Sequence, residues 1–220
     1  MSASDAEREI FARIRGASRR SSPEQVAAEL RALQSPRAAM LPTPDLCEAL
    51  QRNLQRNGAT TAVVKTRSEA VLEISQFIAR KHRQRRIVTG HDPRLAALPW
   101  RDGGLLPRFD VAQAGDTVSV SYAQCAVAET GSLALLLDRN NPALNSLLIQ
   151  DHLILIDRDD IHARLESIWG QASLSSAGSR PRGMMMISGP SSTADISMQL
   201  VLGAHGPRAL HVIIVGTASK

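Results

Sequence analysis

The chain has 220 residues, of which 43% are hydrophobic and only 3% aromatic, and its formal net charge at pH 7 is +5. This length suffices to bury a full hydrophobic core, whereas so few aromatic residues argue against a surface that stacks nucleic-acid bases on rings. Because no apolar run approaches the ~20 residues of a membrane span and the first residues lack an apolar signal-peptide core, we expect a cytoplasmic protein.

Two amphipathic helices are predicted at the start of the chain. The first covers residues 4–15, and the second covers residues 22–33 and opens with the Ser-Pro-Glu-Gln pattern of a capping box. The apolar faces of both helices are narrow. We therefore predict that residues 1–42 form an N-terminal helical arm and that residues 43–220 form the main domain.

Helices and strands alternate through the main domain. Helices are predicted over residues 44–57, 68–81, 95–98, 140–148, 159–169 and 196–202. Strands are predicted over residues 61–65, 86–89, 117–122, 126–128, 132–137, 153–156, 184–187 and 210–215, and residues 101–115 are predicted to be irregular. Because several strands are apolar throughout and amphipathic helices separate them, the pattern indicates an α/β fold with a mostly parallel central sheet flanked by helices.

The chain has only two cysteines, Cys47 and Cys125, and they are far apart in the sequence. Two isolated cysteines cannot by themselves hold an iron–sulfur cluster or a cysteine zinc site. Cys125 lies in an apolar stretch and is interpreted as a small core residue rather than a nucleophile. No metal-ligand spacing and no glycine-rich phosphate loop occurs, so we predict no cofactor held by this chain alone.

The basic residues gather in the first half of the chain. Residues 1–110 contain 19 Lys and Arg against 12 Asp and Glu, whereas residues 111–220 contain 7 against 9. The densest basic run, residues 80–86, lies at the end of a predicted helix, where cations suit the helix dipole. We interpret it as a solvated helix end, with RNA or an acidic partner protein as the alternative.

Three glycine-bearing segments have compositions that suggest a site rather than simple turns. In the first, Glu129, Thr130 and Gly131 follow an apolar strand, and a carboxylate there is expensive to bury unless it is hydrogen-bonded. We regard Glu129 as a catalytic candidate, and Thr130 and Gly131 as ligand-binding candidates. The alternative is a surface glutamate beside a turn glycine.

The second segment is rich in hydroxyls and lies between the predicted strand 184–187 and the predicted helix 196–202. A strand-to-helix turn of this kind directs free backbone N–H groups at an anion near the carboxyl edge of a sheet. Its ligand-binding candidates are Gly189, Ser191, Thr193 and Asp195. The alternative is a capping box in which Ser192 and Asp195 only begin the helix.

In the third segment, His205 stands between two glycines, with Gly203 predicted to end a helix in a left-handed conformation. Histidine can serve as an acid, a base or a ligand near neutral pH, so His205 is a catalytic candidate. Arg208 is a candidate for holding a carboxylate or phosphate. We predict that the three segments converge at one edge of the sheet and form a pocket.

The segments AETGSL, ISGPSSTADI and LVLGAHGPRALHVIIV together resemble the LUD-domain family, in particular its lactate-utilisation protein C group. The resemblance covers residues 61–215 and is most specific in the second half. The family usually has arginine where this chain has Ser192 and an acidic residue where it has Ser197. At the matching positions the resemblance implies a ligand site that includes Glu129, Ser191 and His205.

The resemblance implies a fold like that of the sugar-phosphate isomerases and CoA-transferases. It also implies a part in the oxidation of L-lactate to pyruvate, alongside two partner subunits that carry iron–sulfur clusters. One alternative is a free-standing enzyme, similar to CoA-transferases or formyltetrahydrofolate cyclo-ligases, that acts on a small carboxylate with Glu129 as the acyl-accepting nucleophile. A regulatory module that contacts RNA through residues 80–86 is the other alternative.

Overall fold

The structure is a computed structural model. It describes residues 3–17, 22–32, 41–168, 181–194 and 200–216. The chain divides into two compact units, Met1–Ala38 and Ala39–Lys220, and each is described by itself. None of the helices in the described parts is both long and apolar enough to cross a membrane.

The first unit contains the two predicted helices, α1 (Ala3–Ala17) and α2 (Pro23–Ala32). The predicted capping box is confirmed, because the Gln25 N–H donates to Ser22 Oγ at 3.1 Å and the Ser22 N–H donates to Gln25 Oε1 at 2.9 Å. These reciprocal bonds satisfy backbone donors that the first turn of a helix leaves unpaired. The capping chemistry therefore explains where α2 begins.

The second unit is built on a six-stranded sheet with the order β1-β12-β7-β4-β2-β3, in which all neighbouring strands are parallel. Its strands are β1 (Thr60–Val64), β12 (Ala209–Val215), β7 (Asp151–Asp157), β4 (Val118–Tyr122), β2 (Arg86–Thr89) and β3 (Leu106–Phe109). The predicted α/β class with a mostly parallel central sheet is confirmed. Strand β3 corrects the prediction that residues 101–115 are irregular. It contains Pro107 and lies at the sheet edge, where a missing N–H is tolerated.

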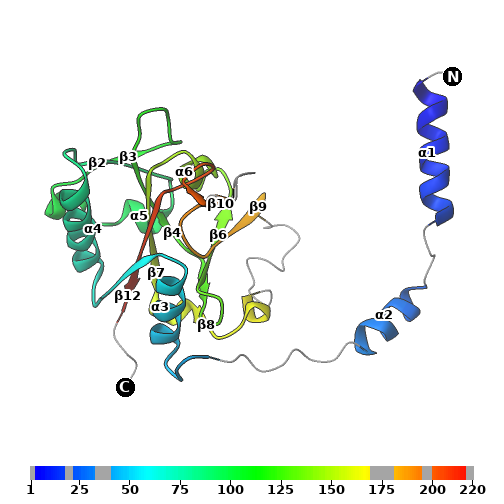
Figure 1. The fold of residues 1–220 in the computed structure, drawn as a ribbon, viewed down its shortest axis with the longest axis horizontal. Helices are drawn as coiled ribbons and strands as arrows, with labels where there is room; N and C mark the ends of the chain where they lie inside the picture. Colours follow the sequence, from blue (N-terminus) through cyan, green and yellow to red (C-terminus); the bar gives the residue numbers. More distant parts are fainter. Residues whose placement is uncertain (1–2, 18–21, 33–40, 169–180, 195–199, 217–220) are drawn as a thin grey trace. The chain divides into compact units, whose positions relative to one another are not determined.

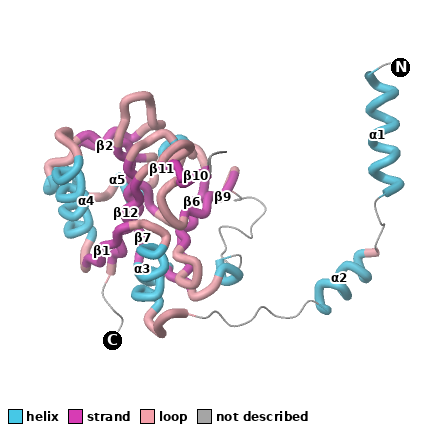
Figure 2. The backbone as a smooth tube through the Cα atoms, in the orientation of Figure 1, coloured by secondary structure: helices cyan, strands magenta, loops and turns pink. Residues whose placement is uncertain are grey.

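Successive residues of the central strands face opposite layers, as the pleat of a strand requires. Leu153 and Leu155 of β7 pack with α4 (Arg67–Lys81) on one side of the sheet. Ile154 and Ile156 pack with α3 (Leu46–Arg56) on the other side. Figure 2 shows α4 and α3 flanking the strands. The short α5 (Pro93–Ala96) and the 3-10 turn η1 (Trp100–Gly103) join the α4 side.

A second sheet, not anticipated from the sequence, covers the α3 side. It has the order β8-β5-β6-β9, formed by β8 (Ile161–His162), β5 (Cys125–Val127), β6 (Ser132–Leu137) and β9 (Gly183–Ile187). The predicted helix 159–169 is therefore wrong over its described part. That part holds a 3-10 turn η2 (Arg158–Asp160), β8 and a 3-10 turn η3 (Leu165–Ile168), because Ile161 pairs with Ala126 of β5.

The predicted helix 196–202 is also wrong where the structure describes it. Strand β10 (Ser192–Ala194) pairs antiparallel with β11 (Leu200–Leu202), and residues 195–199 lie outside the described residues. Thr193 opposes Val201 in this hairpin, and such pairs of β-branched residues favour strands. The hairpin lies near the short α6 (Leu144–Leu147), as Figure 1 shows.

Candidate functional site

The three predicted segments do not share one edge of the central sheet. We call them the carboxylate corner (residues 128–132), the hydroxyl corner (188–193) and the imidazole corner (203–208). The imidazole corner precedes β12 and lies at the amino edge of the sheet. The hydroxyl corner follows β9, which pairs antiparallel with β6. The predicted strand-to-helix turn at the carboxyl edge of a parallel sheet is therefore wrong.

The hydroxyl and imidazole corners nevertheless adjoin. The Ser191 N–H donates to the Pro207 carbonyl and the Gly203 N–H donates to the Ser191 carbonyl, each at 2.8 Å. A Cβ at Gly206 would lie 3.0 Å from Ser191 Cβ, so the close approach requires a small residue there. Gly203 has the predicted left-handed conformation, with φ of 75°, although it follows strand β11 rather than a helix.

A pocket of about 200 Å³, here called the amino-edge pocket, opens between these two corners and the amino ends of β7 and β12. Three predicted site residues line it, namely Gly189, Ser191 and His205. The other lining residues are mostly apolar: Leu147, Met185, Met186, Ile187, Pro207 and Leu210, with Ser146, His152, Ser188 and Gly206. None of these described lining residues is Lys, Arg, Asp or Glu. The pocket is thus small, mostly apolar and edged by a few polar groups, as ligand sites often are.

Two buried polar side chains form part of the pocket wall. His152, fully buried, lies in β7, and its Nε2 is 2.9 Å from Ser121 Oγ. Within the described residues, His152 Nδ1 and Ser146 Oγ have no hydrogen-bond partner. Burial lowers the pKa of His152 to about 3, so its imidazole is neutral near pH 7. Neither His152 nor Ser146 was singled out from the sequence as a candidate site residue.

The carboxylate corner lies apart from this pocket. The Glu129 carboxylate accepts a hydrogen bond from the Leu165 N–H at 2.9 Å and does not line the pocket that His205 lines. The corner is joined to the hydroxyl corner through side chains, because Thr130 Oγ1 donates to Ser132 Oγ at 2.8 Å and Ser132 Oγ is 2.7 Å from Ser188 Oγ. The two catalytic candidates therefore do not meet in one pocket.

Both the carboxylate and hydroxyl corners are held against the C-terminal end of α3. The Asn53 side-chain amide donates to the Ala128 carbonyl at 2.7 Å. A Cβ at Gly131, where φ is 66°, would lie 2.8 Å from the backbone of Asn53, and one at Gly189 would lie 2.4 Å from the Asn57 carbonyl oxygen. These two glycines are thus required for close packing on α3, a role separate from the ligand binding predicted for them.

The remaining candidates lie outside the pocket. Thr193 is exposed in β10, and Asp195 lies outside the described residues. Ser192 begins β10 and does not begin a helix there, so the predicted helical capping box is wrong. Arg208 is exposed, and its aliphatic stem covers Gly203, whose Cβ would lie 2.2 Å from Arg208 Cγ. Arg208 and His205 line a wider neighbouring groove with Gln150.

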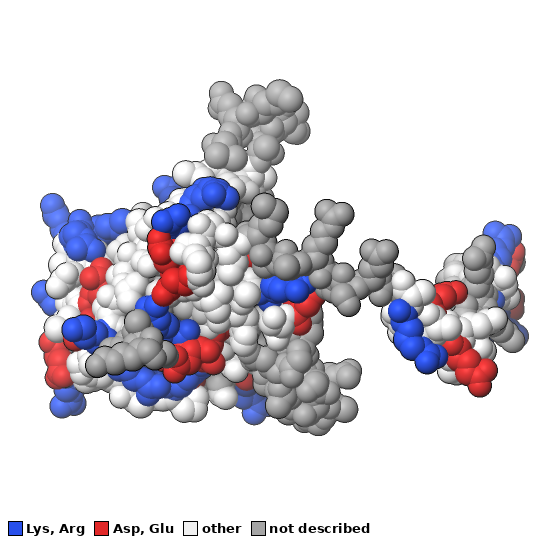
Figure 3. Space-filling view, turned by 90° about the horizontal axis from the view of Figure 1, so that it is seen from below, with Lys and Arg blue, Asp and Glu red and all other residues white. Residues whose placement is uncertain are grey.

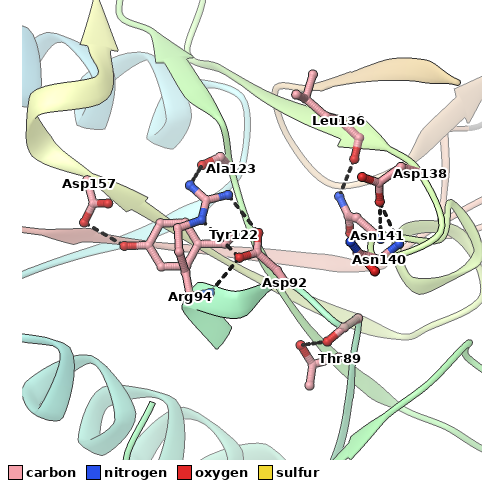
Figure 4. Close-up of polar contacts among 11 residues, drawn as sticks. Thr89, Asp92, Arg94, Tyr122, Ala123, Leu136, Asp138, Asn140, Asn141 and Asp157 are labelled. Carbon is pink, nitrogen blue, oxygen red and sulfur yellow. Dashed lines mark hydrogen bonds and ion pairs between the residues drawn. The ribbon is translucent and has the colours of Figure 1, made fainter. Parts of the chain in front are cut away.

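A polar array at the opposite, carboxyl edge of the sheet was missed from the sequence (Figure 4). The Arg94 guanidinium donates to Asp92 Oδ1 at 3.1 Å and Oδ2 at 2.8 Å and to the Ala123 carbonyl at 3.2 Å. It lies 4.2 Å from the Tyr122 ring centroid, and the Tyr122 hydroxyl donates to Asp157 Oδ1 at 2.6 Å. The signal was the position of Asp92 and Arg94 just after strand β2, where open α/β sheets bind ligands.

The charges of this array support one another. Burial opposes a charge on Arg94, but its hydrogen bonds to Asp92 and the charge of that carboxylate outweigh burial and raise the Arg94 pKa. Burial, together with the neighbouring Asp157 carboxylate, also raises the pKa of Tyr122. A pocket of about 130 Å³ adjoins these side chains. The array keeps Tyr122 protonated and Arg94 charged, which suits a structural or ligand-orienting role.

The comparisons with known proteins decide the family. The LUD domain matches residues 47–215 of the chain. The chain belongs to the LUD-domain family. The match includes the amino-edge pocket, the carboxyl-edge array and all three corners, whereas the N-terminal unit lies outside it.

Several curated proteins resemble this LUD domain. The lactate utilization protein C of Macrococcus caseolyticus is 25% identical over 183 residues, which cover 77% of this chain and 78% of that protein. Its counterpart in an Exiguobacterium strain is 26% identical over 70% of this chain and 72% of that protein. An uncharacterized protein of Neisseria meningitidis serogroup B is 37% identical over 95 residues, but the match spans only 40% of its length.

A solved structure resembles the fold of this LUD domain. The crystal structure of a DUF162 family protein from Deinococcus radiodurans aligns with a TM-score of 0.56 and 19% identity, over 78% of this chain and 96% of that chain. At this identity the likeness bears on the fold alone. It agrees with the α/β architecture described above.

Part of the basic run, residues 80–86, anchors the C-terminal end of helix α4 in this LUD domain. Helix α4 ends at Lys81, as predicted. Lys81 Nζ lies 3.1 Å from Asp151 Oδ1, and His82 Nε2 lies 2.6 Å from Asp151 Oδ2. On the face drawn in Figure 3, basic and acidic side chains alternate and do not gather into one basic field.

Both cysteines of the LUD domain are buried as free thiols. They lie in different core clusters, Cys47 in α3 and Cys125 in the second sheet. Burial raises the pKa of Cys125 to about 11 and also raises that of Cys47. No group of three or more His, Cys, Asp or Glu among the described residues is placed to hold a metal ion.

We expect both thiols to be unreactive in the native protein. At pH 8 a thiol with a pKa near 11 is only about 0.1% thiolate, and the thiolate is the reactive form. Titration with Ellman's reagent should therefore modify neither Cys47 nor Cys125 within minutes, while the same protein in guanidinium chloride should react at both. Rapid modification of either thiol in the folded protein would contradict this expectation.

Proposed function

We propose that this chain acts as a lactate-utilisation protein C-type subunit that takes part in the cytoplasmic oxidation of L-lactate to pyruvate. The observation that carries the proposal is the match to proteins named lactate utilization protein C along more than two thirds of both chains. Membership of the LUD-domain family supports it.

The chemistry of the reaction implies partners. Oxidation of the C2 alcohol of lactate removes two electrons and two protons, so an electron acceptor is required. The chain has two cysteines, and they lie in different core clusters, so it cannot supply the four thiolates of an iron–sulfur cluster. We therefore propose that the clusters belong to partner subunits that receive these electrons.

The wider groove next to the amino-edge pocket, which Gln150 also lines, is the part of the chain best suited to a small carboxylate. Arg208, with no ion pair among the described residues, and His205 line this groove together. A guanidinium holds carboxylates well, and an imidazole can move a proton near neutral pH. The alternative, a transferase with Glu129 as nucleophile, has less support because that carboxylate is bonded to the Leu165 N–H outside the groove.

The role in lactate oxidation is tested by deletion and rescue in the source organism. We expect a strain that lacks the chain to fail to grow on L-lactate and to grow normally on pyruvate, and the wild-type chain to restore growth. Affinity-tagged protein should copurify with iron–sulfur subunits, recognised by their visible absorption. Normal growth of the deletion strain on lactate, with no copurifying cluster protein, would refute the proposal.

A matched pair of variants tests the groove separately. Arg208→Ala should reduce rescue on L-lactate at least tenfold because it removes the guanidinium, while copurification should stay intact because the side chain that also covers Gly203 is exposed. Arg101→Ala, which removes an exposed arginine in η1, should rescue fully. Equal rescue by both variants would remove Arg208 from the site without affecting the family role.

A further inference from the structure

The amino-edge pocket contains two buried polar atoms without partners. These are His152 Nδ1 and Ser146 Oγ, both unpaired within the described residues and both belonging to residues that line the pocket. Buried polar groups in folded proteins are nearly always hydrogen-bonded, and an exception calls for an explanation such as a ligand or an ordered water. The pocket wall is therefore chemically incomplete as the protein alone builds it.

Both atoms are held firmly in place. The His152 ring is oriented by the contact of its Nε2 with Ser121 Oγ at 2.9 Å, on the neighbouring strand β4. Ser146 lies in α6, which is anchored because Asn145 Oδ1 accepts the Ala112 N–H at 2.7 Å. The Ser119 hydroxyl adds a bond from β4 to the Asn145 carbonyl. Rigid support of this kind is what a preorganised binding site requires.

The surroundings of these atoms favour an uncharged partner. The described lining residues include no Lys or Arg that would offset a buried carboxylate or phosphate, and most of them are apolar. An unpaired charge is costly to bury in such a place. The imidazole of His152 is itself neutral, and it can donate or accept at Nδ1 depending on its tautomer.

We infer that the amino-edge pocket binds a small uncharged molecule, or the uncharged end of a larger one, through hydrogen bonds to His152 Nδ1 and Ser146 Oγ. Its ligand class is a short aliphatic amide, ketone or alcohol, with the polar head toward these two atoms and the apolar body against Met185, Met186 and Leu210. This inference does not depend on the role in lactate oxidation.

The test uses the full chain and the isosteric pair butyramide and butyrate, with 2-butanone and 2-butanol as further neutral probes. Long-range proton–nitrogen NMR spectra report the Nδ1 resonance of His152 directly. We expect butyramide to shift this resonance saturably, with a Kd on the order of 1–10 mM for a ligand of this size. Butyrate, which has the same shape and a negative charge, should bind at least tenfold more weakly.

Two serine variants separate binding from folding. Ser146→Ala should weaken butyramide binding about tenfold, whereas Ser75→Ala should leave it unchanged. Ser75 lies on α4 outside the pocket, and its Oγ donates a hydrogen bond to the Gly103 carbonyl at 2.7 Å. If Ser146→Ala fails to fold, the response of the wild-type His152 resonance to the four probes decides alone.

Three results would overturn the inference. The first is a His152 Nδ1 resonance that no neutral probe moves at about 100 mM. The second is equal binding of butyrate and butyramide. The third is a crystal soaked with butyramide in which only an ordered water contacts Nδ1 and Ser146 Oγ.

Discussion

Lowering the pH from 6.5 to 4.5 is expected to reduce the free energy of unfolding by about 2 kcal/mol through His152 alone. In the unfolded chain this imidazole titrates near 6.5, whereas burial lowers its pKa in the folded protein to about 3. Between these values the unfolded state binds a proton that the folded state does not. The contribution of the neutral His152 to stability is therefore fully present above pH 6.5 and is lost as the pH falls toward 3.

Urea unfolding at a series of pH values would measure this loss, with His152→Gln as the matched variant. Glutamine does not titrate and retains an amide that can bond Ser121. The free energy of unfolding of this variant should therefore change less with pH than that of the wild type, by up to about 1.4 kcal/mol per pH unit. His211, whose pKa is also lowered by burial, contributes equally to the pH dependence of the unfolding free energy in both proteins. Parallel stability curves for the two proteins would contradict the assignment.

Replacement of Gly131 by alanine is expected to destabilise the protein by about 3 kcal/mol or more. Its φ of 66° costs an alanine roughly 1–2 kcal/mol. In addition, the new Cβ would lie 2.8 Å from the backbone of Asn53 and Leu54, so the carboxylate corner must move away from α3. Backbone atoms cannot yield as a flexible side chain does.

Gly115→Ala is the control for this prediction. Gly115 also has a positive φ, 96°, but nothing lies within 4 Å of where its Cβ would be. Its replacement should cost only the conformational strain, about 1 kcal/mol. Thermal or urea unfolding of both variants measures the difference. Equal destabilisation would mean that the contact with α3 is unimportant.

The elements that the sequence predicted well are those with a clear period and strong end signals. Helix α4 was placed at residues 68–81 and is Arg67–Lys81, and β2 was placed without error. The hairpin β10–β11 was missed because a short apolar run after a turn satisfies helix and strand patterns equally. Strand β8 was missed because two residues carry no period, and only pairing with β5 makes them a strand.

The candidate site was predicted in part. Composition drew attention to Ser191 and His205, and the structure brings them to one pocket. Composition gave no indication that the Glu129 carboxylate would bond the Leu165 N–H of η3, because that depends on how η3 packs against β5 and β8 of the second sheet. Nor did composition single out His152 and Ser146, since a buried histidine and a helix serine become informative only when their neighbours are known.

The alternation along β7 has a consequence for how this domain can vary. Adjacent residues of that strand have opposite tasks, Asp151 toward Lys81 and His152 toward the pocket. Adding or removing one amino acid immediately before the strand would exchange the two faces. A carboxylate would then lie beside Met185 and Met186, and an imidazole would lie beside Lys81 and His82. This domain should therefore tolerate substitutions at the exposed Leu148 and Gln150 far more readily than any change in the length of that connection.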